Sequence, residues 1–165
     1  MISVELIAPQ NAKLFKEVRL RALQDSPTAF SSTYAKESKL TDAEWLDRVA
    51  LWNSATSTAY LALDQGNGCG IAGGMLDKED EAGAHLLSMW VAPTHRRLGI
   101  GRMLVDAVIT WARAWNVRTM QLLVTSNNDS AINFYQRLGF TLTGRTEPYA
   151  NDPALSNFEM IRSLS

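Results

Sequence analysis

The stretch "VAPTHRRLGIGR" (residues 91–102) joins an apolar run that stops at Pro93 to a long amphipathic segment. A glycine-rich turn at a helix start can be a tight turn and nothing more. It can also hold an anion, because the first N–H groups of a helix lack internal partners and the helix dipole adds partial positive charge there. The stretch favours a pyrophosphate cradle, since it gathers three arginines and two glycines: Arg96, Arg97, Arg102, Gly99 and Gly101.

Two common phosphate-binding motifs do not account for this stretch. No G-x-x-x-x-G-K-[ST] string occurs in the chain. A dinucleotide fingerprint needs G-x-G-x-x-G, and here Gly99 and Gly101 are followed by Leu104 at the third position. Two glycines alone are a weak signal, so the surrounding residues must decide.

The composition predicts a single globular domain over residues 1–165, with 46% hydrophobic and 20% charged residues. The net charge of −1 comes without a long basic block, so we expect neither nucleic acid nor a membrane as partner. The one cysteine, Cys69, fits a reducing compartment and is either a small strand residue or a reactive thiol. The start "MISVELIAPQ" lacks the basic residues of a signal peptide, and no apolar run reaches the ~20 residues of a membrane span. We therefore expect a cytoplasmic protein.

Hydrophobic periodicity and turn signals predict eleven main elements. Thr41 and Glu44 form a capping box, and "QGNG" (65–68) joins two strands into a hairpin. The segment 84–125 is expected as a β-α-β unit with parallel strands. The order predicts an α/β (α+β) fold with a mixed, mostly antiparallel, twisted sheet of about seven strands and about four helices on both faces. The expected strands are 2–7, 57–64, 69–76, 84–92, 118–125, 140–146 and 157–164, and the helices 11–25, 41–52, 101–115 and 129–139.

Two motifs in order then point to a family. R-x-x-G-x-G at 96–101, after the apolar strand "LLSMWVAP", resembles the acyl-CoA-binding motif of the GCN5-related N-acetyltransferases (GNAT). "NDSAINFYQRLGF" (128–140) is similar to that family's N-x-x-A-x-x-F-Y-x-x-x-G-F segment at every fixed position. The element order extends the resemblance over nearly the whole chain. The stretch "RLRALQDSPTAF" (19–30) resembles a bacterial branch more loosely.

This resemblance implies a GNAT-like sheet and transfer of an acetyl group from acetyl-CoA to a primary amine of a small molecule or peptide, without a metal. Main-chain N–H groups of 97–102 would hold the pyrophosphate, and the strand ending at Met89–Val91 would pair with the pantetheine arm. An N–H at about Val91 would polarise the thioester carbonyl. The implied donor-binding residues are Met89, Trp90, Val91, Arg96, Arg97, Leu98, Gly99, Ile100, Gly101, Arg102, Asn128 and Tyr135.

Tyr135 is the general acid that the resemblance implies. A leaving thiolate with a pKa of roughly 8.5 departs more easily when a proton donor stands close. Without the motif, a tyrosine on the apolar stripe of a helix is simply a core residue. Asn128 has two readings of equal weight, a contact to the pantetheine arm or a simple helix N-cap.

The general base is open between Glu37 and His85. An alkyl amine with a pKa of about 10.4 is mostly protonated at neutral pH, so a base is useful. Glu37 lies between the first two expected helices, where the family often builds its acceptor site, and is otherwise a solvated surface carboxylate. His85 begins the strand that leads to the donor site, and is otherwise an exposed strand-end histidine. His95 is expected as an exposed loop residue.

The acceptor pocket is the least defined part. Phe30, Tyr34, Trp45 and Trp52 are candidate lining residues, although Trp45 and Trp52 lie on a stripe that also suits core packing. The loop 146–157 either closes over the acceptor or forms a homodimer contact. Two other functions stay open: a non-catalytic module that senses acyl-CoA, and a transferase for a longer acyl chain. The sequence does not name the acceptor.

Overall fold

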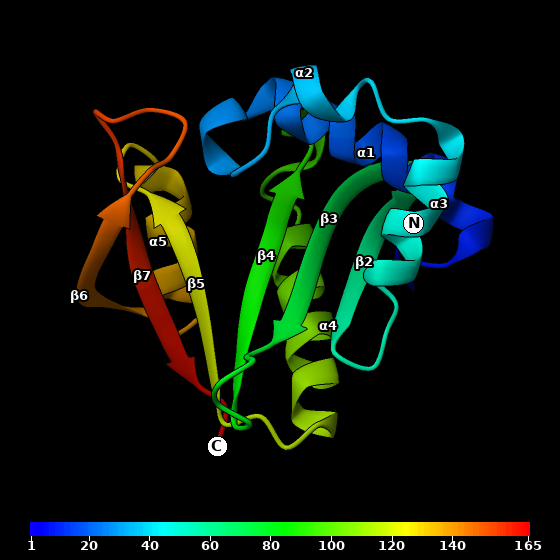
Figure 1. The fold of residues 1–165 in the computed structure, drawn as a ribbon. Coiled ribbons are helices and arrows are strands. Elements are labelled where there is room, and N and C mark those ends of the chain that lie inside the picture. Colours follow the sequence, from blue (N-terminus) through cyan, green and yellow to red (C-terminus); the bar gives the residue numbers. More distant parts are fainter.

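The computed structural model describes residues 1–165 and contains one seven-stranded sheet with the strand order β1-β2-β3-β4-β5-β7-β6 (Figure 1). All neighbouring strands are antiparallel except β4 and β5, so the expected mixed, mostly antiparallel sheet is confirmed. The strands are β1 (Ile2–Leu6), β2 (Ser57–Asp64), β3 (Asn67–Leu76), β4 (Gly83–Val91), β5 (Thr119–Thr125), β6 (Thr141–Pro148) and β7 (Ser156–Ser163).

The helices cover both faces of the sheet, as expected, but there are five rather than about four. They are α1 (Ala12–Asp25), α2 (Tyr34–Glu37), α3 (Asp42–Leu51), α4 (Ile100–Ala114) and α5 (Asp129–Arg137). The additional helix, α2, is a single turn whose start is capped by Thr33 Oγ1. A turn this short leaves no periodic pattern in a sequence. None of the helices is both long enough and apolar enough to cross a membrane.

Adjacent glycines in β3 show how the layers sit. A Cβ on Gly74 would lie 2.7 Å from Val108 of α4, whereas a Cβ on Gly73 would lie 2.9 Å from the ring of Trp52, which ends α3. Successive strand residues point to opposite faces, so α4 covers one face while α1 and α3 cover the other. Figure 1 shows this arrangement, with α4 and α5 behind the sheet.

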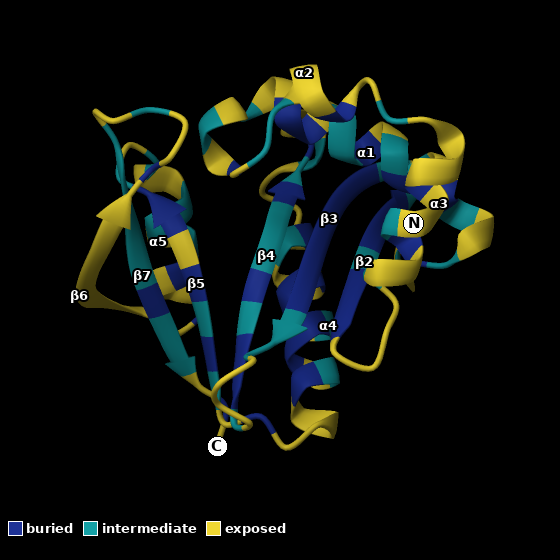
Figure 2. Ribbon diagram, viewed as in Figure 1, coloured by how far each residue is buried: buried dark blue, intermediate teal, exposed yellow.

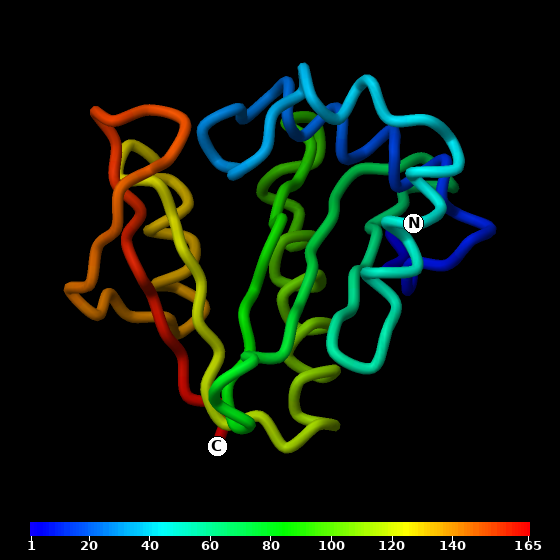
Figure 3. Tube along the Cα trace, in the orientation of Figure 1, coloured from blue at the N-terminus to red at the C-terminus, as the bar shows by residue number.

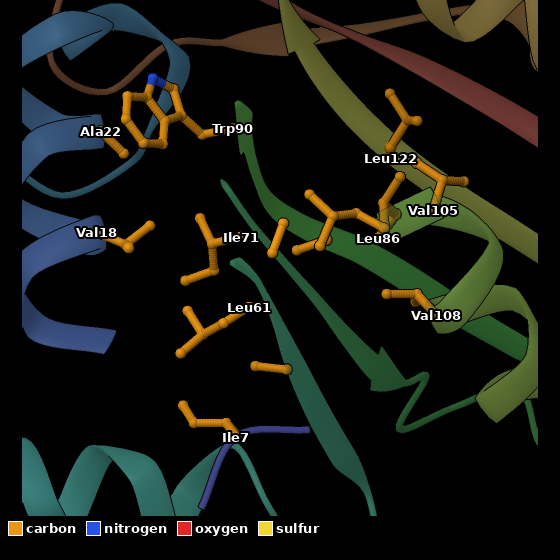
Figure 4. Packing of buried hydrophobic residues seen from close by; sticks show 14 of the residues in the cluster. Ile7, Val18, Ala22, Leu61, Ile71, Leu86, Trp90, Val105, Val108 and Leu122 are labelled. Atoms are coloured by element: carbon orange, nitrogen blue, oxygen red, sulfur yellow. The ribbon is translucent and has the colours of Figure 1, made fainter. Parts of the chain in front are cut away.

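The core is divided by the sheet into two apolar layers. In Figure 4, Val18 of α1 meets Leu61 and Ile71 on one side, and Val105 and Val108 of α4 face Leu86 on the other. Burial is concentrated in β2 and β3, whereas every residue of the edge strand β6 is exposed (Figure 2). The capping box of α3 is confirmed, since Glu44 N donates to Thr41 Oγ1 over 3.2 Å and Thr41 N to Glu44 Oε1 over 3.0 Å.

The parallel pair β4–β5 is the feature that opens the fold. Its strands are paired only from Gly83–Thr119 to His85–Gln121. Beyond these residues the two strands diverge, and the gap widens toward the end of β4 (Figure 3). The sheet therefore has a V-shaped opening between β4 and β5. The main-chain groups by which these two strands face each other beyond His85 and Gln121 are not paired with a neighbouring strand.

Candidate active site

A groove of about 840 Å³ lies at the open end of this V. Its walls come from the end of β4, the loop that precedes α4, the first turn of α4, and α5. Eleven of the twelve residues expected to bind the donor line it, namely Met89, Trp90, Val91, Arg96, Arg97, Gly99, Ile100, Gly101, Arg102, Asn128 and Tyr135. Leu98 does not line the groove, and its side chain is 63% exposed.

The turn into α4 presents unpaired main-chain donors. Gly99 caps the helix with a φ of 81°, in the left-handed region that glycine adopts without strain. The first bond back into the helix is from Met103 N to Gly99 O, over 3.1 Å. The N–H groups of Ile100, Gly101 and Arg102 therefore have no main-chain partner, which is the arrangement that binds anions.

Gly101 has a packing role. A Cβ at this position would lie 2.8 Å from Cζ of Phe134 and 3.2 Å from Cε of Met89. The glycine thus lets the start of α4 approach α5 and the end of β4. A Cβ at Gly99, by contrast, would meet nothing within 4 Å, so that residue is needed for its backbone angle.

The ionisable side chains that line the groove, apart from the phenol of Tyr135, are all basic. Four arginines and one histidine line it, and no Asp or Glu does. Arg96 is held by Asp25 Oδ2 over 2.7 Å and His95 by Asp64 Oδ2 over 2.9 Å. The remaining three arginines, Arg97, Arg102 and Arg137, take part in none of the salt bridges or side-chain hydrogen bonds within the chain. The groove therefore suits a ligand with several negative charges. No three His, Cys, Asp or Glu side chains lie together so as to hold a metal ion.

Val91 turns its main-chain groups into the V. The next residue, Ala92, donates its N–H to Cys69 O of β3 over 2.8 Å. In an antiparallel pair, consecutive residues alternate between bonding the partner strand and facing away from it. Val91 thus faces the β5 side, where its carbonyl accepts from Arg96 Nε over 3.0 Å. Its N–H points into the gap.

Tyr135 lies at the floor of the groove. Its ring packs edge-on against Phe134 and Phe140, with centroid distances of 5.3 and 5.8 Å and interplanar angles of 60° and 67°. Burial raises the pKa of this phenol well above its ordinary value, so the hydroxyl keeps its proton across the physiological range. The side chain is thus both a core residue and a groove residue. Asn128 similarly caps α5, accepting from Ala131 N over 3.2 Å, while lining the groove.

Glu37 is a buried ion-pair member. Its side chain is only 1% exposed, so the alternative of a solvated surface carboxylate is wrong. Arg19 donates to both carboxylate oxygens, over 2.9 and 3.0 Å, and Arg48 lies 3.4 Å away. Burial alone would raise the pKa of Glu37, but the hydrogen bonds and charge of Arg19 outweigh it and hold the pKa below its usual value. An engaged carboxylate of low pKa is a weak proton acceptor.

His85 lies at the closed end of the V. Its Nε2 is 3.0 Å from Asp77 Oδ2 and 3.0 Å from Gln121 Nε2. Met89 is four residues further along β4, a separation of about 13 Å at the rise of an extended strand. The structure therefore does not bring His85 together with the groove-lining end of β4.

Comparison with known families matches residues 20–140 to the Acetyltransferase (GNAT) family. The chain belongs to this family. The match includes both motifs and most of the groove. Among curated relatives, this GNAT chain is 33% identical over 84 residues to the N-terminal acetyltransferase B complex catalytic subunit naa20 of Schizosaccharomyces pombe, covering 49% of this chain and 47% of that protein. It is 35% identical over 65 residues to the peptidyl-lysine N-acetyltransferase YjaB of Salmonella typhimurium, covering 39% and 41%. The matches thus span less than half of either relative.

Solved GNAT structures share the whole fold. The acetyltransferase yncA from Salmonella typhimurium, solved with acetyl-CoA, superposes with a TM-score of 0.82 at 18% identity, over 100% of this chain and 95% of that one. The paia N-acetyltransferase from Thermoplasma acidophilum, solved with coenzyme A, gives 0.77 at 17% identity, over 99% of both chains. These likenesses confirm the GNAT fold that the two motifs predicted.

The acceptor pocket is expected on the side of the sheet that carries α1 and α3, which we call the acceptor side. Of the expected pocket residues, Tyr34 is 40% exposed, and Phe30 is buried beneath the guanidinium of Arg19 at 4.9 Å. Trp45 is only 2% exposed and packs edge-on against Phe15, with ring centroids 5.7 Å apart. Of its two expected roles, it therefore has the one in core packing. None of these three lines the donor groove or the smaller cavity described below, whereas Trp52 lines the smaller cavity.

The loop between β6 and β7 closes over this side. Tyr149 Oη donates to Phe30 O over 2.5 Å, and Asn151 Nδ2 donates to Ser31 O over 3.0 Å. In Figure 1 this loop and the segment after α1 lie next to each other above the V. The contact ties the loop to the segment after α1, and both expected roles, a cover over the acceptor and a homodimer contact, stay predictions.

The residues that sequence reasoning missed include one arginine of the groove and three residues of a second cavity. Arg137 follows the matched F-Y pair by two positions, and its place on the same helix as Tyr135 was a usable signal. Arg19, Arg48 and Ser88 instead line a second, smaller cavity on the acceptor side. Nothing local in the sequence marks these three, because α1, α3 and β4 meet only in the fold.

Proposed function

We propose that this GNAT domain transfers an acetyl group from acetyl-CoA to the primary amine of a small molecule or peptide. The observation that carries the proposal is the groove with three unpaired arginines, which ends at the N–H of Val91 and the phenol of Tyr135. The printed names of two relatives, an N-terminal acetyltransferase subunit and a peptidyl-lysine N-acetyltransferase, support an amine acceptor. The lack of a basic block supports a small molecule or peptide over a nucleic acid, and the single cysteine suits a cytoplasmic setting.

The donor fits the groove by charge and by shape. The N–H groups of residues 100–102 and the free arginines supply positive potential for the phosphates of the donor. The unpaired edge of β4 near Val91 supplies main-chain partners for the amides of the pantetheine arm, as an added strand would. These groups lie in one continuous groove, so the thioester would reach the open V.

In the transfer reaction two groups of the chain then act, the N–H of Val91 and the phenol of Tyr135. A neutral amine attacks the thioester carbonyl, so the new C–N bond forms while the C–S bond breaks. The N–H of Val91 stabilises the charge that develops on the carbonyl oxygen. Tyr135 gives its proton to the departing sulfur, since its raised pKa keeps the hydroxyl protonated until that point. The amine nitrogen gives up one proton to solvent, and solvent returns a proton to Tyr135, so that the products are the amide and the free thiol of coenzyme A. Both oxygens of Glu37 are engaged by Arg19, and His85 lies at the closed end of the V beside Asp77, so we assign neither as the base.

The test is release of the CoA thiol over a panel of amines, with acetyl-CoA binding measured by calorimetry in parallel. We expect binding and turnover with at least one amine class. Binding without turnover on any amine supports an acyl-CoA sensor instead. Absence of both overturns the proposal. Substituting longer acyl-CoA donors in the same assay tests the acyl-chain alternative.

A further inference from the structure

A second cavity of about 70 Å³ lies on the acceptor side of the sheet, beneath α1 and beside α3. Arg19, Arg48, Trp52 and Ser88 form its polar and aromatic wall. Ser88 lines this cavity and the next residue, Met89, lines the donor groove, so β4 alone separates the two spaces. A molecule seated here is therefore placed beside the strand that carries the thioester.

The cavity has an excess of positive charge. Two arginines share one carboxylate, that of Glu37, and no other acidic residue lines the cavity. Arg19 uses three of its five N–H donors, with Nε and Nη2 on Glu37 and Nη1 on Ser88 Oγ at 3.2 Å. Arg48 makes no hydrogen bond of this kind and approaches Glu37 only at 3.4 Å, so it is the less neutralised of the two arginines.

Arg48 is held in place without using its donors. Its guanidinium lies over the Trp45 ring at 5.6 Å, and only Nη1 approaches Glu37, at 3.4 Å. Its Nε and Nη2 make no hydrogen bond within the chain. The side chain is 37% exposed, so it stands where the cavity meets solvent. A fixed guanidinium with a free edge matches the two oxygens of a carboxylate.

The size of the cavity limits the ligand. A water molecule takes about 30 Å³ in the liquid, so the space suits a group of a few heavy atoms. One wall is the indole of Trp52, which lies so close to β3 that a Cβ on Gly73 would come within 2.9 Å of it.

We propose that Arg48 binds a carboxylate carried by the amine acceptor, so that the preferred acceptor is an amine that is also an acid. The inference rests on the proposed acetyl transfer and narrows its substrate class. A free amino acid and a peptide with an acidic side chain near its amine share this chemistry.

The first test compares matched acceptors with and without the carboxylate: lysine against cadaverine, leucine against isoamylamine, and a peptide with aspartate at its second position against the asparagine form. We expect kcat/KM to be about 10- to 100-fold higher for the acid in at least one pair, as for other hydrogen bonds to charged groups. The pair that shows the preference tells amino acid from peptide. Arg48→Gln removes the preference, Arg48→Lys restores part of it, and the exposed Arg118→Gln leaves it unchanged.

A second measurement needs no turnover. The Nε–H resonance of Arg48 is followed by NMR during titration with N-acetylglycine, and with the uncharged N-acetylglycinamide as control. A shift with the acid alone supports the carboxylate site even if no amine is acetylated, in which case only the proposed function fails. An unchanged acid preference in a folded Arg48→Gln, or equal Arg48 shifts with acid and amide, overturns the inference.

Discussion

Trp90 Nε1 donates to Oδ2 of Asp25 over 2.9 Å and so ties the last residue of α1 to the end of β4 that faces the donor groove. The same oxygen accepts from Arg96 over 2.7 Å. Burial alone would raise the pKa of Asp25, but these hydrogen bonds and that of Ser26 lower it below its usual value. One carboxylate therefore fixes both the indole of β4 and the first arginine of the R-x-x-G-x-G motif.

Asp25→Ala is expected to lower the free energy of unfolding by about 1–3 kcal/mol, because it leaves the buried indole N–H of Trp90 without an acceptor. Asp25→Asn keeps an acceptor oxygen and is expected to lose less. Chemical denaturation measures both, with the exposed Asp106→Ala as matched control. If the two Asp25 variants are equally destabilised, the hydrogen bond to Trp90 is not the cause.

Glu37→Gln is expected to cost about 3–5 kcal/mol of stability at neutral pH, because it leaves Arg19 buried with a neutral partner. The pKa of Glu37 is lowered by folding, so its contribution is present above the unfolded pKa of about 4.3 and is lost as pH falls through the lower folded value. The difference in the free energy of unfolding between wild type and Glu37→Gln should thus disappear at acid pH.

Denaturation of both proteins across a pH series measures this gap. The same variant addresses the base assignment. A base role predicts normal stability with turnover abolished, whereas the ion pair predicts a less stable protein that still turns over when folded. A stability gap that grows as pH falls contradicts the ion-pair account.

Tyr135→Phe is expected to lower kcat by about 10²–10⁴, the usual contribution of a positioned acid. Affinity for acetyl-CoA should stay the same, because phenylalanine keeps the ring packing against Phe134 and Phe140. Steady-state kinetics and calorimetry separate the two quantities. Tyr60→Phe in β2 is the control for loss of a hydroxyl elsewhere. Unchanged kcat in Tyr135→Phe removes the general-acid role.

The helices and strands of the fold could be predicted from the sequence because local residue patterns mark where they begin and end. The capping box at Thr41 and the glycine that follows α5, Gly139 with a φ of 92°, mark helix ends through side-chain and backbone chemistry alone. The β-α-β unit predicted that β4 and β5 are parallel. It did not predict the residue at which the two strands separate, because that residue depends on packing between distant elements.

The lining of the large groove was predictable in the same way, since its residues cluster in two short motifs. The lining of the smaller cavity and the burial of Glu37 were not. Glu37 carries no mark of burial in the sequence, because its partners Arg19 and Arg48 come from two other helices. Ser88 adopts a φ of 55° within β4, and no residue next to it in the sequence predicts this backbone angle.

Arg137→Gln is expected to weaken coenzyme A binding about tenfold at low salt, because Arg137 has no salt-bridge partner in the chain and lines the groove. The effect should shrink as salt screens the exposed guanidinium. Calorimetry at two salt concentrations measures it, against the exposed Arg118→Gln. Equal affinity of Arg137→Gln and wild type at low salt would place the phosphates elsewhere.

Tyr149→Phe is expected to loosen the cover over the acceptor side. It removes the donor to Phe30 O and leaves that buried carbonyl unpaired, at a cost of about 1–3 kcal/mol. The donor groove does not include Tyr149, so KM for the amine should rise while the dissociation constant of acetyl-CoA stays constant. Acceptor kinetics and donor calorimetry on the same preparation give the two numbers. Asn151→Ala, which loses the exposed bond to Ser31 O and a longer one of 3.4 Å to Tyr149 Oη but keeps the bond from Tyr149 to Phe30 O, should show the same pattern more weakly. A matched loss of donor affinity in Tyr149→Phe contradicts the assignment, because it means that the loop supports the whole V rather than its acceptor side.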